Sequence, residues 1–182
     1  PQNKNPNNQS TKIRYGVAGR GDIEGIAAMA STFTNLSYHV VFSTKYRKRR
    51  ITTIQEELYK VIGGIIRNHD GKLIEIGGVE DHVHLLIGIP AKIAVADMIR
   101  DIKSNSARWC NEQQHVSSRF QWQTGYAAFT VSHSNCDAVR RYIRNQEAHH
   151  KTQPFEEEFI ELLKRHDIEY DPRYIFENEF VA

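Results

Sequence analysis

Two histidines separated by one residue form the first group in this sequence that could do chemistry. They are His82 and His84, in the segment DHVHLL. On a β-strand alternate side chains share one face and their Cα atoms lie about 6.6 Å apart, so both imidazoles would point the same way. Such a pair can supply two ligands of a metal ion. Two surface or hydrogen-bonded histidines would give the same short pattern, so both interpretations stand at this point.

A tyrosine and a glutamine one helical turn apart form the second group. Tyr142 and Gln146, in the segment YIRNQEAHH, are related as i and i+4, which places them on one face of a helix. A helical tyrosine is more often a packing residue than a nucleophile, and the spacing does not decide between the two. His149 and His150 could be ligands, but we expect them to be solvent-exposed.

Basic residues form the third group, and they occur at three places along the chain. Residues of this kind suit contacts to phosphate groups, although a solvated surface has the same composition. The residues that we predict to bind DNA are Lys45, Arg47, Arg49, Arg100, Lys103, Arg108, Arg141 and Arg144.

Together the three groups suit attack of a tyrosine on a phosphodiester. A phenol has a pKa near ~10 and is a poor nucleophile at neutral pH, whereas a divalent metal would polarise the phosphate and neutralise its charge. His82, His84 and the Gln146 amide oxygen would give three ligands, and nearby arginines could stabilise transition-state charge. The product would be a covalent phosphotyrosine. No GxxxxGK[ST] loop is present, so no nucleotide cofactor is expected.

Four strands and several helices are predicted to position these groups. Periodicity and turn residues predict strands at 37–44, 72–79, 82–89 and 126–132, and helices at 54–69, 93–113, from 135 or 137 to about 150, and 155–165. The order β-α-β-β-α-β is that of a ferredoxin-like α+β sandwich with an antiparallel sheet. The first two helices would cover one face, and extra C-terminal helices would carry the tyrosine. We interpret Glu156–Glu158 as a solvated helix face and the tail from Asp167 as irregular.

The composition is that of an ordinary soluble globular protein. The chain has 182 residues, of which 40% are hydrophobic and 25% charged, and it has no run near the ~20 apolar residues of a membrane span. Cys110 and Cys136 are isolated, which favours reduced thiols in a cytoplasmic protein without a structural zinc site. Residues 29–150 hold 16 basic and 11 acidic residues, a mild excess that favours a polyanionic partner.

Three segments are expected along the chain. Residues 1–28 begin polar and Asn-rich, so we expect a disordered leader or an artificially added segment before Met29. Residues 29–174 would form the domain, and residues 175–182 a C-terminal tail.

These motifs resemble the single-tyrosine HUH transposases of the insertion sequence 200/605 family, the IS200-like transposases. HUH denotes histidine-hydrophobe-histidine, here His82-Val83-His84. The similarity extends over about residues 32–174 and includes YHVVFSTKYR, IGGVEDHVHLL, WQTGYAAFTVS, VRRYIRNQEAHHK and FEEEF. It implies that Tyr142 is the catalytic tyrosine and Gln146 the third metal ligand. Tyr126, in GYAAF, we interpret as structural.

The resemblance also implies a substrate, a metal and an assembly. Proteins of this kind cut single-stranded DNA at hairpin-marked element ends, form a 5′-phosphotyrosine link and rejoin strands, using Mg²⁺ or Mn²⁺. Imidazole ligands would also accept zinc. Such proteins are homodimers in which the tyrosine helix of one subunit can complete the site of the other. No motif position is lost in this chain, so we expect an active enzyme.

Three other functions remain open on the sequence. A host-domesticated repeat-associated tyrosine transposase would have the same site but cut scattered palindromes, and the genomic context of the gene would distinguish it. A non-catalytic single-stranded nucleic-acid-binding module would need the aromatic pattern of RNA-binding sheets, which the central strands lack. A metal-dependent nuclease that uses water would keep cutting after Tyr142→Phe.

Overall fold

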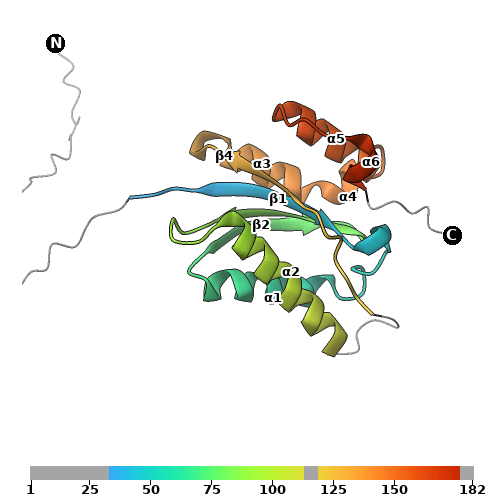
Figure 1. Ribbon diagram of the computed structural model, residues 1–182, viewed down its shortest axis with the longest axis horizontal. Helices are drawn as coiled ribbons and strands as arrows, with labels where there is room; N and C mark the ends of the chain where they lie inside the picture. The colour runs from blue at the N-terminus through green and yellow to red at the C-terminus, as the bar shows by residue number, and fades with distance from the viewer. Residues whose placement is uncertain (1–32, 113–118, 177–182) are drawn as a thin grey trace, which may run out of the picture. The chain divides into compact units, whose positions relative to one another are not determined.

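A four-stranded antiparallel sheet organises the chain (Figure 1). The structure, a computed structural model, describes residues 33–112 and 119–176. The expected leader, residues 1–28, and most of the expected tail lie outside the described residues. The strands, in the spatial order β2-β3-β1-β4, are β1 (Ser37–Ser43), β2 (Lys72–Gly78), β3 (His82–Gly88) and β4 (Ala127–Val131).

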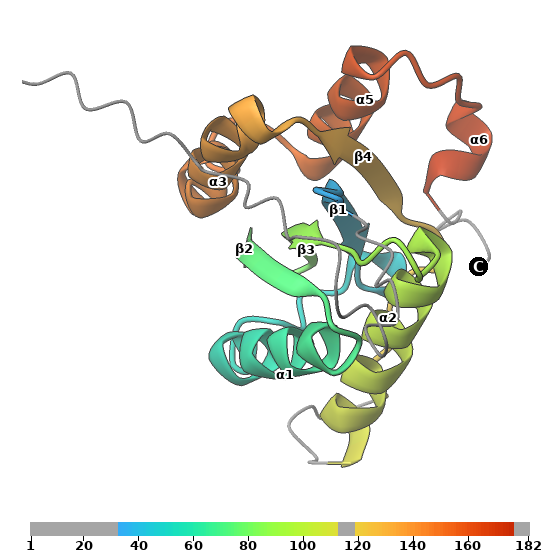
Figure 2. The same ribbon diagram turned by 90° about the vertical axis from the view of Figure 1, so that its left-hand side faces the viewer.

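Two long helices connect the strands and cover one face of the sheet (Figure 2). They are α1 (Gln55–Asn68) and α2 (Val95–Glu112). The β-α-β-β-α-β order and the position of β1 and β3 in the centre confirm the predicted ferredoxin-like α+β fold. In the part of the chain that the structure describes, no helix is long and apolar enough to cross a membrane.

Alternation along the two central strands sends different side chains to the two faces of the sheet. Val83, Leu85 and Ile87 of β3 are fully buried in the larger apolar core, together with Val40 and Phe42 of β1, and this core packs against α1 and α2. The intervening residues of each strand point to the opposite face. The alternation predicted for the strand that carries His82 and His84 is therefore confirmed.

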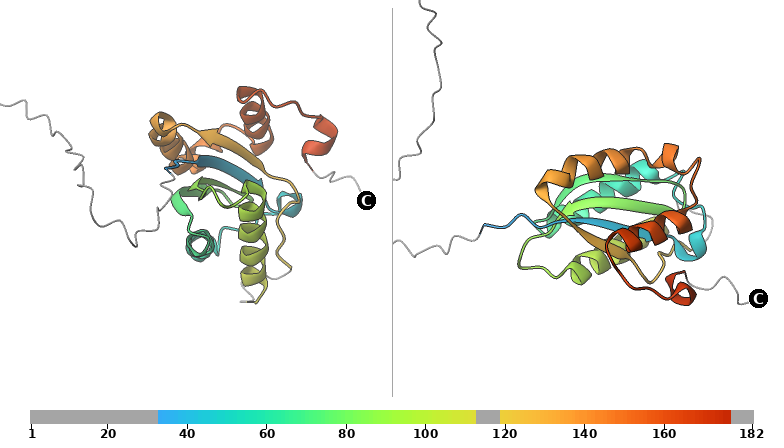
Figure 3. Two further views of the ribbon diagram at one scale, coloured as in Figure 1. Left: turned by 60° about the vertical axis from the view of Figure 1, so that its left-hand side comes forward. Right: turned by 90° about the horizontal axis from the view of Figure 1, so that it is seen from above.

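The C-terminal helices lie over this opposite face of the sheet (Figure 3). They are α3 (Cys136–Arg144), α4 (Gln146–His149) and α5 (Phe155–Arg165). A second, smaller apolar cluster joins α5 to the sheet and consists of Val41, Ala127, Phe129, Phe155, Leu162 and Leu163. Two 3-10 turns, η1 (Lys45–Arg47) and η2 (His133–Asn135), follow β1 and β4.

Two predictions about the C-terminal half are wrong in detail. The single helix expected to run to about residue 150 is divided at Asn145, whose N–H lies 3.2 Å from two carbonyl oxygens, those of Arg141 and Tyr142. Asparagine has a low helix propensity, which suits this break. The tail contains a short helix, α6 (Pro172–Ile175), capped by the Asp171 side chain. Asp-Pro is a sequence signal for such a start.

Gly77 allows α3 to approach the sheet closely. A Cβ at this position of β2 would collide with the backbone oxygen of Ile143 in α3. Ile143 is itself fully buried, so an outward movement of the helix would remove it from this contact. Because Tyr142 precedes Ile143, this contact also determines where the tyrosine lies.

Candidate active site

The two histidines of the DHVHLL segment lie side by side on β3 under the C-terminal helices. Both side chains are fully buried, and their ring centroids are 5.2 Å apart. The strand register pairs His82 with Ser43 and His84 with Val41. The strand therefore brings the imidazoles together as the sequence predicts.

Each imidazole is held by a neighbour at its Nδ1 atom. His82 Nδ1 lies 2.7 Å from Asp81 Oδ1, and His84 Nδ1 lies 3.0 Å from His39 Nε2. A carboxylate accepts, so His82 Nδ1 donates, which leaves its Nε2 with a lone pair. When His84 donates to His39, its Nε2 is likewise free. Partners of this kind orient metal-binding histidines.

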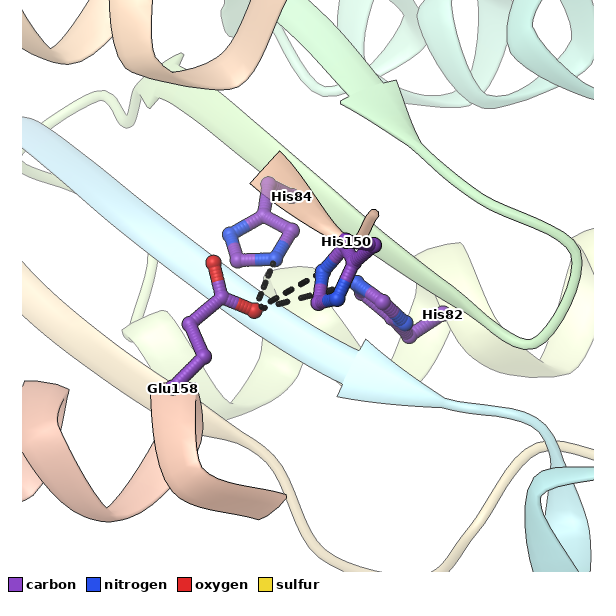
Figure 4. Close-up of side chains that lie close together, drawn as sticks. All are labelled: His82, His84, His150 and Glu158. Atoms are coloured by element: carbon purple, nitrogen blue, oxygen red, sulfur yellow. Dashed lines mark ion pairs between the residues drawn. The ribbon is translucent and has the colours of Figure 1, made fainter. Parts of the chain in front are cut away.

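A carboxylate from α5 lies in the middle of the site (Figure 4). Glu158 is only 2% exposed. Its Oε2 lies 3.4 Å from His84 Nε2, 3.9 Å from His82 Nε2 and 3.1 Å from His150 Nε2. The ligand atoms of these four residues all lie within 4.8 Å of one another. The arrangement has the donor types and the convergence of a metal site.

Tyr142 and Gln146 reach the same carboxylate from α3 and α4. The Tyr142 hydroxyl donates a hydrogen bond to Glu158 Oε1, and Gln146 Nε2 donates to the same oxygen at 2.9 Å. The Tyr142 ring centroid lies 5.9 Å from that of His84. Tyr142 and Gln146 thus face the histidines even though a helix break separates them.

Several buried polar atoms of the site have no hydrogen-bond partner. Among the described residues, they include His82 Nε2, His84 Nε2, His149 Nε2 and Glu158 Oε2. Such atoms are costly to bury unless something satisfies them. A divalent cation would satisfy the imidazole nitrogens and the carboxylate oxygen together, so the residues present fit a metal ion.

Burial and mutual contact shift the pKa values of this cluster. Burial, with the neighbouring His84, lowers the pKa of His39 to about 3, and burial lowers the pKa of His84 to about 4. Burial and then Glu158 raise the pKa of the Tyr142 phenol above 10. Burial alone would raise the pKa of Glu158, but the imidazoles of His150 and His84 and the hydroxyl of Tyr142, all close to its oxygens, hold it below its ordinary range. At neutral pH the site therefore holds a neutral phenol, neutral His39 and His84, and an ionised carboxylate.

Comparison with known proteins shows to which family this chain belongs. Residues 32–146 match the family described as "Transposase IS200 like". The chain belongs to the IS200-like transposase family. The match ends at Gln146, so it includes the tyrosine but not His150 or Glu158.

Named relatives and solved structures agree with this family. The transposase for insertion sequence element IS200 of Salmonella typhimurium is 29% identical over 128 residues, covering 65% of this chain and 82% of the relative. The ISDra2 transposase TnpA of Deinococcus radiodurans is 25% identical, covering 61% of this chain and 84% of the relative. A crystal structure of a Deinococcus radiodurans protein proposed to be a transposase has a TM-score of 0.52 at 26% identity, covering 63% of this chain and 93% of the other.

A further solved structure resembles this IS200-like transposase in fold. It is a REP-associated tyrosine transposase bound to a REP hairpin, with a TM-score of 0.52 at 14% identity, covering 82% of this chain and 95% of the other.

Glu158 and His150 depart from what the sequence predicts for this IS200-like transposase. The solvated face expected for Glu156–Glu158 is wrong at Glu158, and the His150 side chain, expected to be exposed, is only 11% exposed. Glu158 lies three residues after Phe155 and four before Leu162, both of which are buried. A carboxylate within an apolar helical stripe was the available signal.

The three basic residues of α2 lie apart from the histidine cluster. Helix α2 covers the sheet face opposite the histidines (Figure 2). Arg100, Lys103 and Arg108 line a groove of about 800 Å³ between α2 and residues 119–126. Lys103 also bonds the Thr124 and Gly125 carbonyl oxygens, at 2.9 and 2.8 Å.

The other predicted DNA-binding residues lie just after β1 and on α3. Arg47 forms an ion pair with Glu156, and Arg144 Nε lies 2.7 Å from Glu75 Oε2. Lys45, the first residue of η1, places its ammonium 5.2 Å from the centre of the Tyr46 ring. The remaining two residues, Arg49 and Arg141, are exposed. The structure thus distributes the predicted basic residues over separate surfaces.

Proposed function

We propose that this IS200-like transposase cuts and rejoins single-stranded DNA through a covalent phosphotyrosine at Tyr142. The observation that carries the proposal is the convergence of the Tyr142 hydroxyl and the two histidine Nε2 atoms on one buried carboxylate. A tyrosine with only a packing role would not require a buried carboxylate and two imidazoles beside its hydroxyl.

Different residues of the site would bind the metal and attack the phosphodiester. His82 and His84 would hold Mg²⁺ or Mn²⁺, with Gln146 as the third ligand that the family resemblance implies. When bound, the metal would polarise the phosphodiester and offset its charge. Asp81 and His39 hold the two imidazoles in position, and α3 holds the phenol beside them.

The proposed reaction exchanges one phosphate ester for another. The Tyr142 oxygen attacks phosphorus, a bond forms between them, and the bond from phosphorus to the 3′ oxygen breaks. The phenol loses one proton and the departing 3′ oxygen gains one. Rejoining is the reverse attack by a 3′-OH, so no external energy source is required.

The partners are a hairpin-marked single strand of DNA and a second copy of the chain. The hairpin follows from the family resemblance, and a fold neighbour has a REP hairpin bound. The homodimer follows from the resemblance alone. Within one chain Tyr142 already lies beside its own His84, which supports a site completed in cis.

The test uses single-stranded DNA from the flanks of the gene, labelled at its 3′ end, with Mn²⁺ or Mg²⁺. A labelled protein adduct on a denaturing gel is expected for the natural chain and for Tyr126→Phe, and none for Tyr142→Phe. The matched control separates loss of a nucleophile from loss of a tyrosine, since Tyr126 is 40% exposed and precedes β4.

Two other outcomes would contradict the proposal. Cleavage without an adduct that persists in Tyr142→Phe would identify a nuclease that uses water. DNA binding that is indifferent to chelation, with no cleavage of a wide hairpin library, would favour the non-catalytic module. A third outcome, adducts with scattered palindromes but not with the gene's flanks, would retain the tyrosine chemistry and indicate the domesticated form.

A further inference from the structure

Glu158 is the buried charged group at the centre of the site to which the proposed function assigns no chemical role. It lies on α5, beyond the residues that match the family. Two buried imidazole nitrogens and one hydroxyl converge on its two oxygens. An isolated carboxylate is expensive to bury, so a buried one is normally paired or bound to a metal.

We propose that Glu158 is a further ligand of the metal in this chain and positions Tyr142 with its second oxygen. The inference rests on the proposed function, because it concerns the same metal. It adds to the two histidine donors a carboxylate supplied by a helix outside the matched family region. The oxygen of Gln146, which the family resemblance implies as a ligand, lies 2.9 Å from His150 Nε2 in this structure.

The distances at Oε2 suit a shared cation. Opposite ligands of one Mg²⁺ or Mn²⁺ lie about 4.2 Å apart, since each metal–oxygen distance is roughly 2.1 Å. Glu158 Oε2 is 3.4 Å from His84 Nε2 and 3.9 Å from His82 Nε2, within that limit. Among the described residues all three atoms are buried without a hydrogen bond, and at Oε2 a metal would compete with the ion pair to His150 Nε2 at 3.1 Å.

The Oε1 atom is fully occupied, which leaves Oε2 for the metal. Tyr142 and Gln146 both donate to Oε1. An ionised carboxylate only accepts, so the Gln146 amide must present its NH₂ to Glu158. Its own oxygen then lies 2.9 Å from His150 Nε2. The carboxylate is held at a fixed angle, with one oxygen directed to the nucleophile and the other to the histidines.

An apolar side chain of similar shape at position 158 would not account for the polar groups that converge there. Phe155, Leu162 and Leu163 of α5 belong to an apolar cluster, so an uncharged residue at position 158 would pack beside them at lower cost. His150 Nε2 lies 3.1 Å from Glu158 Oε2, so one imidazole is paired with the carboxylate. This one pair leaves the buried Nε2 atoms of His82 and His84 without a hydrogen-bond partner.

The test measures Mn²⁺ affinity by calorimetry on the full chain and on Glu158→Gln, with Glu157→Gln as the matched control. Glu157 is the preceding residue of α5 and is exposed, so both variants remove one negative charge. We expect Glu158→Gln to weaken Mn²⁺ binding by about tenfold or more, as loss of support in a metal site does. Glu157→Gln should bind as the natural chain does.

A second variant keeps the test decisive if the first is unstable. Glu158→Asp retains the carboxylate on a shorter stem, so it should bind Mn²⁺ more weakly than the natural chain but more tightly than any folded Glu158→Ala or Glu158→Gln protein. Circular dichroism identifies which variants are folded. Equal Mn²⁺ affinity in Glu158→Asp and the natural chain, with Glu158→Gln unfolded, would count against ligation and for a structural role.

The two proposals fail in different ways. Mn²⁺ affinity that is unchanged or increased in Glu158→Gln, together with normal adduct formation, would overturn the ligand role alone and leave Glu158 as a cover of the site. A tenfold loss of affinity in a protein whose natural form makes no adduct would overturn the tyrosine chemistry and leave the ligand role standing.

Discussion

Single residues in this site act through the atoms that their neighbours leave free. His39 illustrates this, because it touches no expected substrate and contacts His84 through Nε2 at 3.0 Å. It thereby selects the ring atom that His84 presents to the site. A residue of this kind positions a ligand, and its effects should appear in metal affinity and in stability before they appear in chemistry.

The pH dependence of stability tests this at the residue scale. The folded pKa of His39 is about 3, against 6.5 for the free side chain. Below pH 6.5 the unfolded chain therefore takes up a proton that the folded chain does not, so the free energy of unfolding falls as pH falls toward 3. At pH 5 this loss is about 2 kcal/mol for one histidine.

We expect His39→Asn to remove this contribution in chelator-treated protein. Urea unfolding at pH 7 and pH 5 should show a fall in stability smaller by about 2 kcal/mol than in the natural chain. His133→Asn, which changes an exposed histidine, should show the full fall. Identical pH profiles for both variants would mean that His39 is not held neutral by the fold.

Elements determine how closely the nucleophile approaches the metal ligands. Helix α3 lies directly on β2 at Gly77, and β3 presents the histidines one strand further along. The break at Asn145 then lets Gln146 turn toward Glu158. The geometry of the site thus depends on two contacts, that of α3 with β2 at Gly77 and that of Gln146 with Glu158 on α5.

Gly77→Ala tests the first of these contacts. The added methyl would force α3 away from the sheet, at a cost of about 1–3 kcal/mol in unfolding free energy. A displacement near 1 Å can reduce a rate by about 100-fold, so we expect adduct formation to fall sharply at saturating Mn²⁺. Rapid-quench gels and urea titrations would measure both effects.

Gly88→Ala is the matched control, because a Cβ there meets Lys72 Cβ at 3.6 Å, an ordinary contact. It should leave the adduct rate near that of the natural chain. A normal rate in Gly77→Ala would show that α3 is not positioned by this contact.

At the scale of the whole molecule, a buried polar cluster and a basic groove lie on opposite sides of one sheet. The histidine cluster lies under α3, α4 and α5, while the groove lined by Arg100, Lys103 and Arg108 lies beside α2. The cluster combines His82 and His84 of β3 with His150, just after α4, and Glu158 of α5, so a bound metal would connect the sheet to the C-terminal segment. Metal binding and global stability should therefore be linked.

Chelation tests this linkage at the scale of the molecule. At a Mn²⁺ concentration of about 100 times Kd, binding stabilises the folded state by about 2.7 kcal/mol, which raises Tm by roughly 5–10 °C for a domain of this size. EDTA should reverse the shift. The His82→Asn/His84→Asn protein should show no shift, and an equal shift in that variant would locate the binding elsewhere.

The sequence by itself determined the fold and the residues that carry the family. Period-two alternation in the central strands and the order of the elements were sufficient for the ferredoxin-like sheet, because burial on one face imposes that pattern on the residues themselves. His82, Val83 and His84 are local in the chain, so their shared geometry could be predicted from strand periodicity alone.

Only the tertiary structure decided which distant residues meet those histidines. Glu158 and His150 are separated from His84 by more than sixty residues, and nothing in local periodicity reports a contact across that distance. Composition indicated an exposed acidic run, but the packing of Phe155 and Leu162 on the sheet turned one of its carboxylates inward. A charge can be buried only where the groups packed against it compensate for the loss of water. For Glu158 these groups are imidazoles and the phenol of Tyr142.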